Sequence, residues 1–389
     1  MRIVSKLLAA ASVATAITVM AATSALADPP PGVTPKPADV VGVGSDTMQT
    51  LFDQFSHDYN ATHSTGQLFS FDALNPNNGQ MGDSIQLKSG SANCNIPRPD
   101  GSSAGIVALI NTLKTGTHPC IDFARSSRPP AGTDPAFITF ITLAGDAVTY
   151  ATQPGSNAPA NLTTADLIGI FNCTIRQWNQ IPGNSGGSSA TISAFIPQAI
   201  SDTQSFFLNA IGLTAPGACV STSATRAGMA GANDNTLQES QGVAPSLNTN
   251  KANVIVAFSV GRWIAERFHS ASCGTIAQCF AHPNNCTPGT QNLFGCDIHG
   301  TMVLDSINGT APTVGSGQNT TINPAFAPAF TRLLYEVVNQ NASGGVPAYL
   351  QSYFGPTGFT CTSAVAKTDL KNYGFLVLPA GTTAGHCGA

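Results

Sequence analysis

Apolar and polar positions along the chain follow two periods, which together predict strands that lead into helices. Val40 to Val43 form a short apolar run that is typical of a buried strand. Beyond Thr47, apolar residues recur at helical spacing on one face, at Met48, Leu51, Phe52, Phe55 and Tyr59. Ser45 or Asp46 is the expected cap of this helix.

The same succession recurs further along the chain. Helices are predicted after residues 101–103, after the Thr-Thr-Ala-Asp stretch at 163–166, which resembles a capping box, and after 198–203. A long amphipathic helix is predicted at 326–338. Strands are predicted at 121–124, 137–143, 147–151, 191–196 and 375–378. Strands that alternate with helices indicate an α/β architecture with largely parallel pairing.

The start of the chain predicts export. Two basic residues precede an apolar run that extends to about Ala22, and Ala25-Leu26-Ala27 then offers a small-x-small cleavage site. We therefore expect a signal peptide at 1–27, cleaved after about Ala27. A membrane anchor is the alternative, but the run is Ala-rich and no stop-transfer charges follow it. No cysteine lies near the cleavage site, so we expect a secreted, extracellular protein without a lipid anchor.

Composition limits the class of protein and of partner. Charged residues make up only 9% of the chain and hydrophobic residues 42%, which is sufficient for packed cores. The net charge of −4 argues against nucleic acid or an anionic membrane as partner. Any bound anion must then be held by local groups. A mature chain of about 360 residues is long enough for two domains.

The ten cysteines predict disulfides, because an exported chain meets an oxidising compartment. Pairing of sequence neighbours would join Cys94 to Cys120, Cys173 to Cys219, and Cys361 to Cys387, with two more bonds among Cys273, Cys279, Cys286 and Cys296. The last four could also form a zinc site with His282 and His299. No Cys-x-x-Cys pair is present, so disulfides are favoured and no metal or cofactor is expected.

Three turns share a design in which hydroxyl-bearing residues stand directly before a predicted helix. Their residues are Gly-Ser-Asp-Thr at 44–47, Gly-Ser-Ser-Ala at 101–104 and Ser-Asp-Thr at 201–203. A helix start offers free N–H groups and the positive end of the helix dipole, and hydroxyls add further donors. Each turn alone is most simply an N-cap. Convergence of the three, with a fourth polar turn at 125–128, would hold an oxyanion.

These turns and their flanks resemble the phosphate-binding substrate-binding proteins of ABC importers, especially secreted forms from high-GC Gram-positive bacteria. The resemblance is carried, in this order, by residues 42–47, 100–105, 121–127, 162–179 and 196–207. It implies a two-lobed, hinged α/β fold of the periplasmic-binding-protein-like type II, with the ligand in the cleft. A Pro-rich lead-in is expected at 28–38. Lobe I would comprise 39–145 plus 301–389, and lobe II 146–300, with a Cys-rich loop region at 270–300.

The resemblance also implies which residues bind the anion. The positions that match the family's binding turns are Ser45, Asp46, Thr47, Ser102, Ser103, Ser126, Ser127, Ser201 and Thr203. Ser127 stands where the family usually has an Asp that accepts the proton of hydrogen phosphate. The fourth turn continues to Gln204 and lacks the family's nearby Arg. Arg125, with Arg128, could supply that charge, because an Arg fork suits a tetrahedral oxyanion; both could equally be surface residues.

Asp46 carries the most information about the ligand. Inside the site it would accept from a protonated anion and repel a fully deprotonated one, which favours hydrogen phosphate over sulfate. If it only caps its helix, the site has no obvious proton acceptor. Asp202 raises the same question.

We therefore expect a solute-binding protein with no chemical step, which captures phosphate or a related small oxyanion. An ABC permease is a possible partner, no nucleic acid is expected, and a monomer is expected. One alternative is a paralogue for another anion or a small organic ligand. Another is a secreted Ser hydrolase or phosphatase, since residues 183–187 match Gly-x-Ser-x-Gly, although in a Gly/Ser-rich loop. A surface-interaction protein on the same scaffold is the third.

Overall fold

The computed structural model describes most of the chain. The described residues are 28–29, 32–75, 81–112, 119–223, 237–242, 245, 248–269, 299–340, 345–379 and 387. The predicted signal peptide and Cys273, Cys279, Cys286 and Cys296 lie outside these ranges. Across the described ranges, every helix is too short or too polar to cross a lipid bilayer.

Strands and helices are interspersed along these ranges. The strands are β1 (Val40–Gly44), β2 (Leu68–Ser70), β3 (Ser84–Gln86), β4 (Asn95–Pro97), β5 (Phe123–Ser126), β6 (Ile138–Thr152), β7 (Asn161–Leu162), β8 (Ser193–Phe195), β9 (Val254–Ser259), β10 (Val303–Leu304), β11 (Ser306–Ile307), β12 (Thr313–Val314), β13 (Thr321–Ile322) and β14 (Thr331–Asn339). The α-helices are α1 (Gln49–Asn60), α2 (Ser102–Thr112), α3 (Thr164–Phe171), α4 (Asp202–Ala210), α6 (Val260–Ile264), α8 (Gln351–Phe354), α9 (Phe359–Thr362) and α10 (Ala364–Asn372). Short 3₁₀ turns complete the chain, the most relevant being η1 (Asp46–Met48) directly before α1.

One mixed sheet runs through the molecule, with the strand order β2-β1-β5-β14-β6-β9-β8. β1 pairs in parallel with β2 and with β5, and β8 pairs in parallel with β9. β14 lies antiparallel between β5 and β6, and β6 lies antiparallel to β9. The predicted α/β class is therefore confirmed, and the antiparallel strands in the middle make the sheet mixed.

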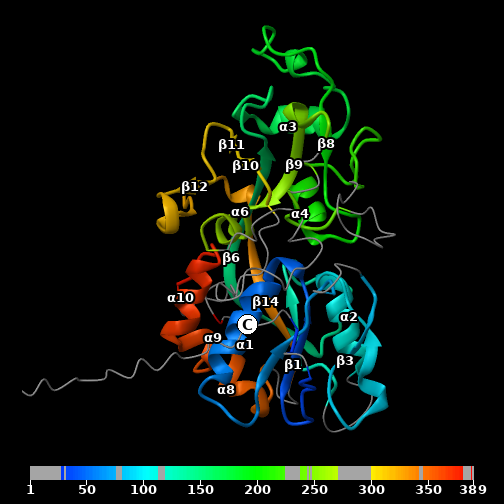
Figure 1. The fold of residues 1–389 in the computed structure, drawn as a ribbon, viewed down its shortest axis with the longest axis vertical. Coiled ribbons are helices and arrows are strands. Elements are labelled where there is room, and N and C mark those ends of the chain that lie inside the picture. Colours follow the sequence, from blue (N-terminus) through cyan, green and yellow to red (C-terminus); the bar gives the residue numbers. More distant parts are fainter. Residues whose placement is uncertain are drawn as a thin grey trace, which may run out of the picture.

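The elements form two lobes joined by β6 and β14 (Figure 1). In the lower lobe, α1, α8 and α10 pack on one face of the sheet around Phe52, Phe55 and Leu370. On the other face, α2 packs through Ile106 and Leu109. The upper lobe has its own core, in which α3 and α4 pack beside β8 and β9. Burial on both faces explains why β1 and β9 are almost wholly apolar.

The core of the upper lobe also includes Met302, Ile307, Ile322 and Phe330. These residues follow the predicted boundary at residue 300. The boundaries of the lobes stay a prediction, and this packing favours a return to the lower lobe at the start of β14.

The helix predicted at 326–338 is wrong. This segment forms a 3₁₀ turn at Pro328–Phe330 and then β14. Apolar residues at helical spacing are equally compatible with a strand that is buried on both faces, and β14 is buried along most of its length between β5 and β6. The strands predicted at 137–143 and 147–151 form one continuous strand, β6, which is long enough to enter both lobes.

Three of the predicted disulfides are present. They join Cys94 to Cys120, Cys173 to Cys219, and Cys361 to Cys387. The capping box before α3 is also confirmed: Thr163 accepts from the N–H of Asp166, and the Asp166 carboxylate accepts from the N–H of Thr163.

The Asp146 carboxylate forms hydrogen bonds with several segments that meet between the lobes. Asp146 lies on β6 directly opposite Arg332 of β14, and its carboxylate is fully buried. Arg332 donates to it from Nε at 3.0 Å and pairs with it through Nη2 at 2.9 Å. The Ser259 hydroxyl at the end of β9 and the N–H of Gly261 in α6 also donate to this carboxylate. The Asp146 side chain thus connects two paired strands, β6 and β14, with the start of α6.

We predict that Asp146→Ala lowers the free energy of unfolding by about 3–5 kcal/mol, because it leaves the Arg332 guanidinium buried without its partner. Asp134→Ala is the matched control. Asp134 pairs with Arg128 at 2.8 Å, but both side chains are partly exposed, so the expected loss is under about 1 kcal/mol. Urea unfolding measures both values, and equal losses would contradict the special role of Asp146.

Candidate ligand-binding site

Three of the predicted turns meet at one edge of the lower-lobe sheet. β1 and β5 end side by side, with Gly44 opposite Arg125, and Gly44 also forms a bridge to Asp100 just before α2. The carboxyl ends of parallel strands are the usual place for a ligand in open α/β sheets. Gly105 allows this arrangement, because a Cβ there would lie 2.5 Å from the Cα of Gly44.

The fourth turn faces this edge from the upper lobe. Ser201 is the N-cap of α4, and its hydroxyl oxygen accepts from the N–H groups of Thr203 and Gln204. The side chains of Ser201 and Thr203 are buried. The helix start predicted at 201–203 is therefore present.

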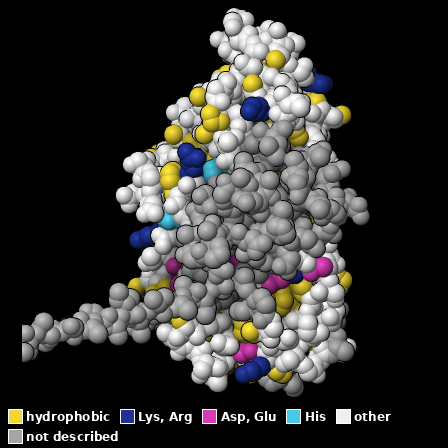
Figure 2. Space-filling model, viewed as in Figure 1, with side chains coloured by type: hydrophobic (Ala, Val, Ile, Leu, Met, Phe, Trp, Pro, Cys, Tyr) yellow, Lys and Arg dark blue, Asp and Glu magenta, His cyan; other side chains and the backbone are white. Residues whose placement is uncertain are grey.

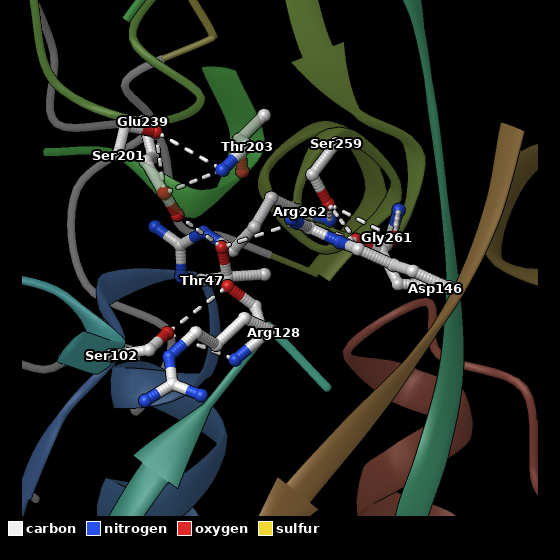
Figure 3. Close-up of polar contacts among 12 residues, drawn as sticks. Thr47, Ser102, Arg128, Asp146, Ser201, Thr203, Glu239, Ser259, Gly261 and Arg262 are labelled. Carbon is white, nitrogen blue, oxygen red and sulfur yellow. Dashed lines mark hydrogen bonds and ion pairs between the residues drawn. The ribbon is translucent and has the colours of Figure 1, made fainter. Parts of the chain in front are cut away.

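A carboxylate that sequence reasoning did not single out lies between the two lobes. Glu239 Oε1 accepts from the Ser201 hydroxyl at 2.6 Å and from the Thr203 N–H at 3.0 Å. Its Oε2 accepts from the Thr47 hydroxyl of the lower lobe at 2.5 Å. Figure 3 shows Ser201, Thr203 and Thr47 gathered around Glu239. The donors predicted for an oxyanion thus converge on a side chain of the protein itself.

Asp46 and Glu239 are neighbouring buried carboxyl groups whose pKa values are shifted in opposite directions. Burial, followed by the charge of Glu239, raises the pKa of Asp46 well above its ordinary value, and Asp46 donates a hydrogen bond to Glu239. Burial alone would raise the pKa of Glu239 too. That hydrogen bond, the nearby Arg332 charge, and the Ser201 and Thr47 hydroxyls outweigh it and lower the pKa to about 2. Asp46 therefore holds the proton while Glu239 carries the negative charge.

Arg332 supplies a cationic group to this cluster. Besides its pair with Asp146, its Nη2 lies 3.4 Å from the Thr47 hydroxyl, and its guanidinium lies over the Phe206 ring of α4 at 5.7 Å. Arg332 is 6% exposed, and its Nη1 has no hydrogen-bond partner among the described residues. A buried guanidinium nitrogen without an acceptor is costly, so it favours an anion in contact with it.

A second contact between the lobes lies next to the first. Burial, together with the Glu239 charge, raises the pKa of Asp202 of α4, and the neighbouring Ser102 hydroxyl opposes this rise. The Ser102 oxygen also accepts from the N–H of Ser127 at 3.0 Å. Gln198 donates to Asp100 at 2.8 Å nearby. In this structure the predicted turns meet across the cleft through carboxylates.

The remaining predicted residues are directed elsewhere. Ser103 is exposed and accepts from Arg128, which pairs with Asp134 and points away from Glu239 in Figure 3. The Ser126 hydroxyl donates within its own turn, to the Arg128 carbonyl.

Arg125, the predicted anion-binding cation, is fully buried. Its guanidinium donates to the carbonyls of Gly44, Ser45 and Phe71 and to the Ser70 hydroxyl. Arg125 thus braces the turn after β1, and Arg332 is the cation that reaches Thr47.

Arg332 and Glu239 belong to this group of polar residues between the lobes, but neither was predicted from the sequence, for different reasons. Arg332 lies in the segment predicted as an amphipathic helix, where a lone Arg is expected on the solvent face. An interpretation as a central strand would have placed it inside, where a charge needs a partner. Glu239 lies in a polar stretch without periodicity, and nothing in its local pattern indicates burial.

Comparison with known proteins agrees with this fold. Residues 31–267, more than half of the chain, match the model of the PBP superfamily domain. The chain belongs to the PBP superfamily. No curated protein sequence matches the chain.

Solved structures support the same fold for this PBP-superfamily chain. An ABC-type phosphate transport receptor from Vibrio cholerae superposes with a TM-score of 0.51 at 14% identity, covering 87% of this chain and 99% of that one. A putative phosphate ABC transporter substrate-binding protein with bound phosphate from Clostridium perfringens gives 0.50 at 12% identity, covering 87% and 98%. At these identities the likeness concerns the fold. It confirms the expected two-lobed, type II periplasmic-binding-protein-like architecture.

The Gly-x-Ser-x-Gly stretch at 183–187 gains no support as a nucleophile site. It lies between the 3₁₀ turn η4 (Trp178–Gln180) and β8, rather than between a strand and a helix. Within the described residues no hydrogen bond joins Ser185 to a histidine.

We predict that Asp46→Asn removes part of the pH dependence of stability. The raised pKa of Asp46 means that the folded protein holds a proton that the unfolded chain releases above about pH 4. The wild type should therefore lose stability relative to the variant as pH rises, by up to about 1.4 kcal/mol per pH unit until Asp46 ionises. Urea unfolding of both proteins from pH 5 to pH 8 measures this difference. A constant difference would contradict the assignment of the proton to Asp46.

Proposed function

We propose that this chain is an extracellular solute-binding protein that captures a small oxyanion, phosphate before others, between its two lobes without a chemical step. One observation carries the proposal. Buried donors from both lobes, on Thr47, Ser201 and Thr203, converge on a single carboxylate, which is itself a planar oxyanion. Groups arranged in this way suit a ligand with several acceptor oxygens.

The spare donors favour a ligand with more than two oxygens. Ser45 Oγ, Thr203 Oγ1 and Arg332 Nη1 are buried and have no hydrogen-bond partner among the described residues. A carboxylate offers two oxygens, whereas a tetrahedral oxyanion offers four. We propose Ser45, Asp46, Thr47, Ser201, Thr203 and Arg332 as the binding residues, with Ser102 and Ser127 beside them at the Asp202 contact.

Asp46 is the residue that would distinguish phosphate from sulfate. Hydrogen phosphate brings a proton that an ionised Asp46 can accept, whereas sulfate requires Asp46 to keep its own proton. The preference for phosphate should therefore grow with pH. The surroundings also agree: among the described side chains visible in Figure 2 charged ones are few, so local donors rather than a general field would hold the anion.

The covalent chemistry supports an extracytoplasmic place of action. Disulfides such as Cys94–Cys120 form and persist in oxidising compartments, which agrees with export. Both structural neighbours described above are named as components of phosphate ABC transport. An ABC permease as partner and action as a monomer belong to this proposal.

A second candidate function is a surface-interaction protein that no longer binds a small ligand. The observation that favours it is Glu239, because this side chain occupies the donors that a ligand would need. Titration with anions separates the two candidates.

We expect calorimetric titration of the ligand-stripped mature protein to give saturable binding of one phosphate per chain. Sulfate should bind more weakly, with a larger gap at pH 8 than at pH 6, because Asp46 ionises more readily at the higher pH. Absence of saturable binding with millimolar phosphate would contradict phosphate as the ligand and favour the interaction role.

The combined change Ser201→Ala and Thr203→Ala should weaken phosphate binding by roughly 100- to 10,000-fold, since it removes two hydroxyl donors and each hydrogen bond to a charged group contributes about 1.5–3 kcal/mol. Ser363→Ala is the control, because Ser363 caps α10 in the same way as Ser201 caps α4 but lies in the lower lobe's helical layer. Both proteins lose a helix cap, worth about 1 kcal/mol of stability. Equal affinities in the double variant and the control would remove this turn from the site.

A further inference from the structure

The Glu239 side chain joins the lobes in the way that a ligand would. Its two carboxylate oxygens divide between them: Oε1 contacts Ser201 and Thr203 of the upper lobe, and Oε2 contacts Thr47 of the lower lobe. Glu239 is only 6% exposed, so its charge is removed from water. An anion that links both halves of a hinged protein stabilises the closed state.

Glu239 and an external oxyanion compete for the same donors. A hydroxyl has one hydrogen to donate, and those of Thr47 and Ser201 both point at Glu239. Two anions at this point would also repel each other in a poorly solvated space that already holds Asp46 and Asp202. When Glu239 occupies these donors, an external oxyanion is therefore excluded, and a bound oxyanion excludes Glu239.

The surrounding structure compensates the cost of burying this carboxylate. The hydrogen bond with Asp46 and the nearby Arg332 charge both favour its ionised form, and Arg332 Nη2 lies 3.4 Å from the Thr47 hydroxyl oxygen. A buried charge with this many donors is a specific arrangement, since an unpaired one would cost several kcal/mol.

We propose that Glu239 is an internal ligand that closes the cleft of the empty protein and sets its affinity threshold for oxyanions. The oxyanion part of this inference rests on the proposed function, whereas the closure part does not. Binding then requires Glu239 to leave its donors, so the apparent dissociation constant equals the intrinsic one divided by the fraction of molecules in which Glu239 is displaced. Weak ligands, which cannot displace it, are excluded.

The decisive variant is Glu239→Ala, tested for two separate properties. Titration with inorganic phosphate measures affinity, and small-angle X-ray scattering of the ligand-free protein measures whether the lobes separate. We expect phosphate to bind about 10- to 100-fold more tightly than in the wild type, as a displaced fraction of 0.01–0.1 implies. We also expect a larger radius of gyration without ligand. Glu239→Gln, which keeps one acceptor oxygen but no charge, should lie between the two proteins.

Asp58→Asn is the matched control. It also removes one negative charge, but on α1, where Asp58 contacts Gln54 and His57 rather than the cleft. Its affinity and radius of gyration should equal those of the wild type.

Acetate provides a further arm, because it can replace the missing carboxylate. Added to Glu239→Ala, it should compete with phosphate and return the radius of gyration toward the wild-type value, with no effect on the wild type.

The outcomes separate the two proposals. Unchanged or weaker phosphate binding by Glu239→Ala, with an unchanged radius of gyration, would overturn the internal ligand and leave the proposed function standing. No phosphate binding by either protein, with expansion of Glu239→Ala that acetate reverses, would overturn phosphate as the ligand while supporting closure by Glu239.

Discussion

The pair formed by Asp146 and Arg332 is the interaction on which the rest of the structure depends. It joins β6 and β14 where both pass between the lobes, and it also fixes the start of α6 through Ser259 and Gly261. Because both side chains are buried, neither can lose its partner without a large penalty. The same pair orients Arg332 toward Thr47, so the element that holds the lobes together also supplies the positive charge at the candidate site.

The negative charges of the carboxyl groups at the site are limited by protonation and by hydrogen-bond donors, rather than neutralised by many cations. Asp46, Asp202 and Glu239 lie together, and only Glu239 has a lowered pKa. The neutral form of Asp46 converts a repulsion into a hydrogen bond. This arrangement would let a chain with 16 Lys and Arg residues and a net charge of −4 hold the oxyanion that we propose as its ligand.

Much of the fold could be predicted from the sequence because its signals are local. Apolar runs marked β1 and β9, the Thr163 and Asp166 pair marked α3, and close spacing along the chain marked three disulfides. The hydroxyl turns around Thr47 and Ser201 were also visible as helix starts.

What could not be predicted depends on contacts between distant segments. The position of Arg332 requires the pairing of β14 with β6, and that of Glu239 requires the closure of two lobes. The interpretation of 326–338 as a helix failed for the same reason, since only burial between two neighbouring strands distinguishes β14 from a helix.

The connection between the lobes limits how they can move. β6 and β14 are hydrogen-bonded to each other from Ile138 and Asn339 to Ala147 and Thr331, with an irregularity between Leu334 and Tyr335. A pair of bonded strands bends easily out of the plane of the sheet but resists shear and stretching, because both would break the ladder of backbone hydrogen bonds. We therefore expect the two halves to move chiefly by flexing about an axis across this ribbon. Such flexing would return residues that share a partner between the lobes, such as Thr47 and Ser201 at Glu239, to the same register each time.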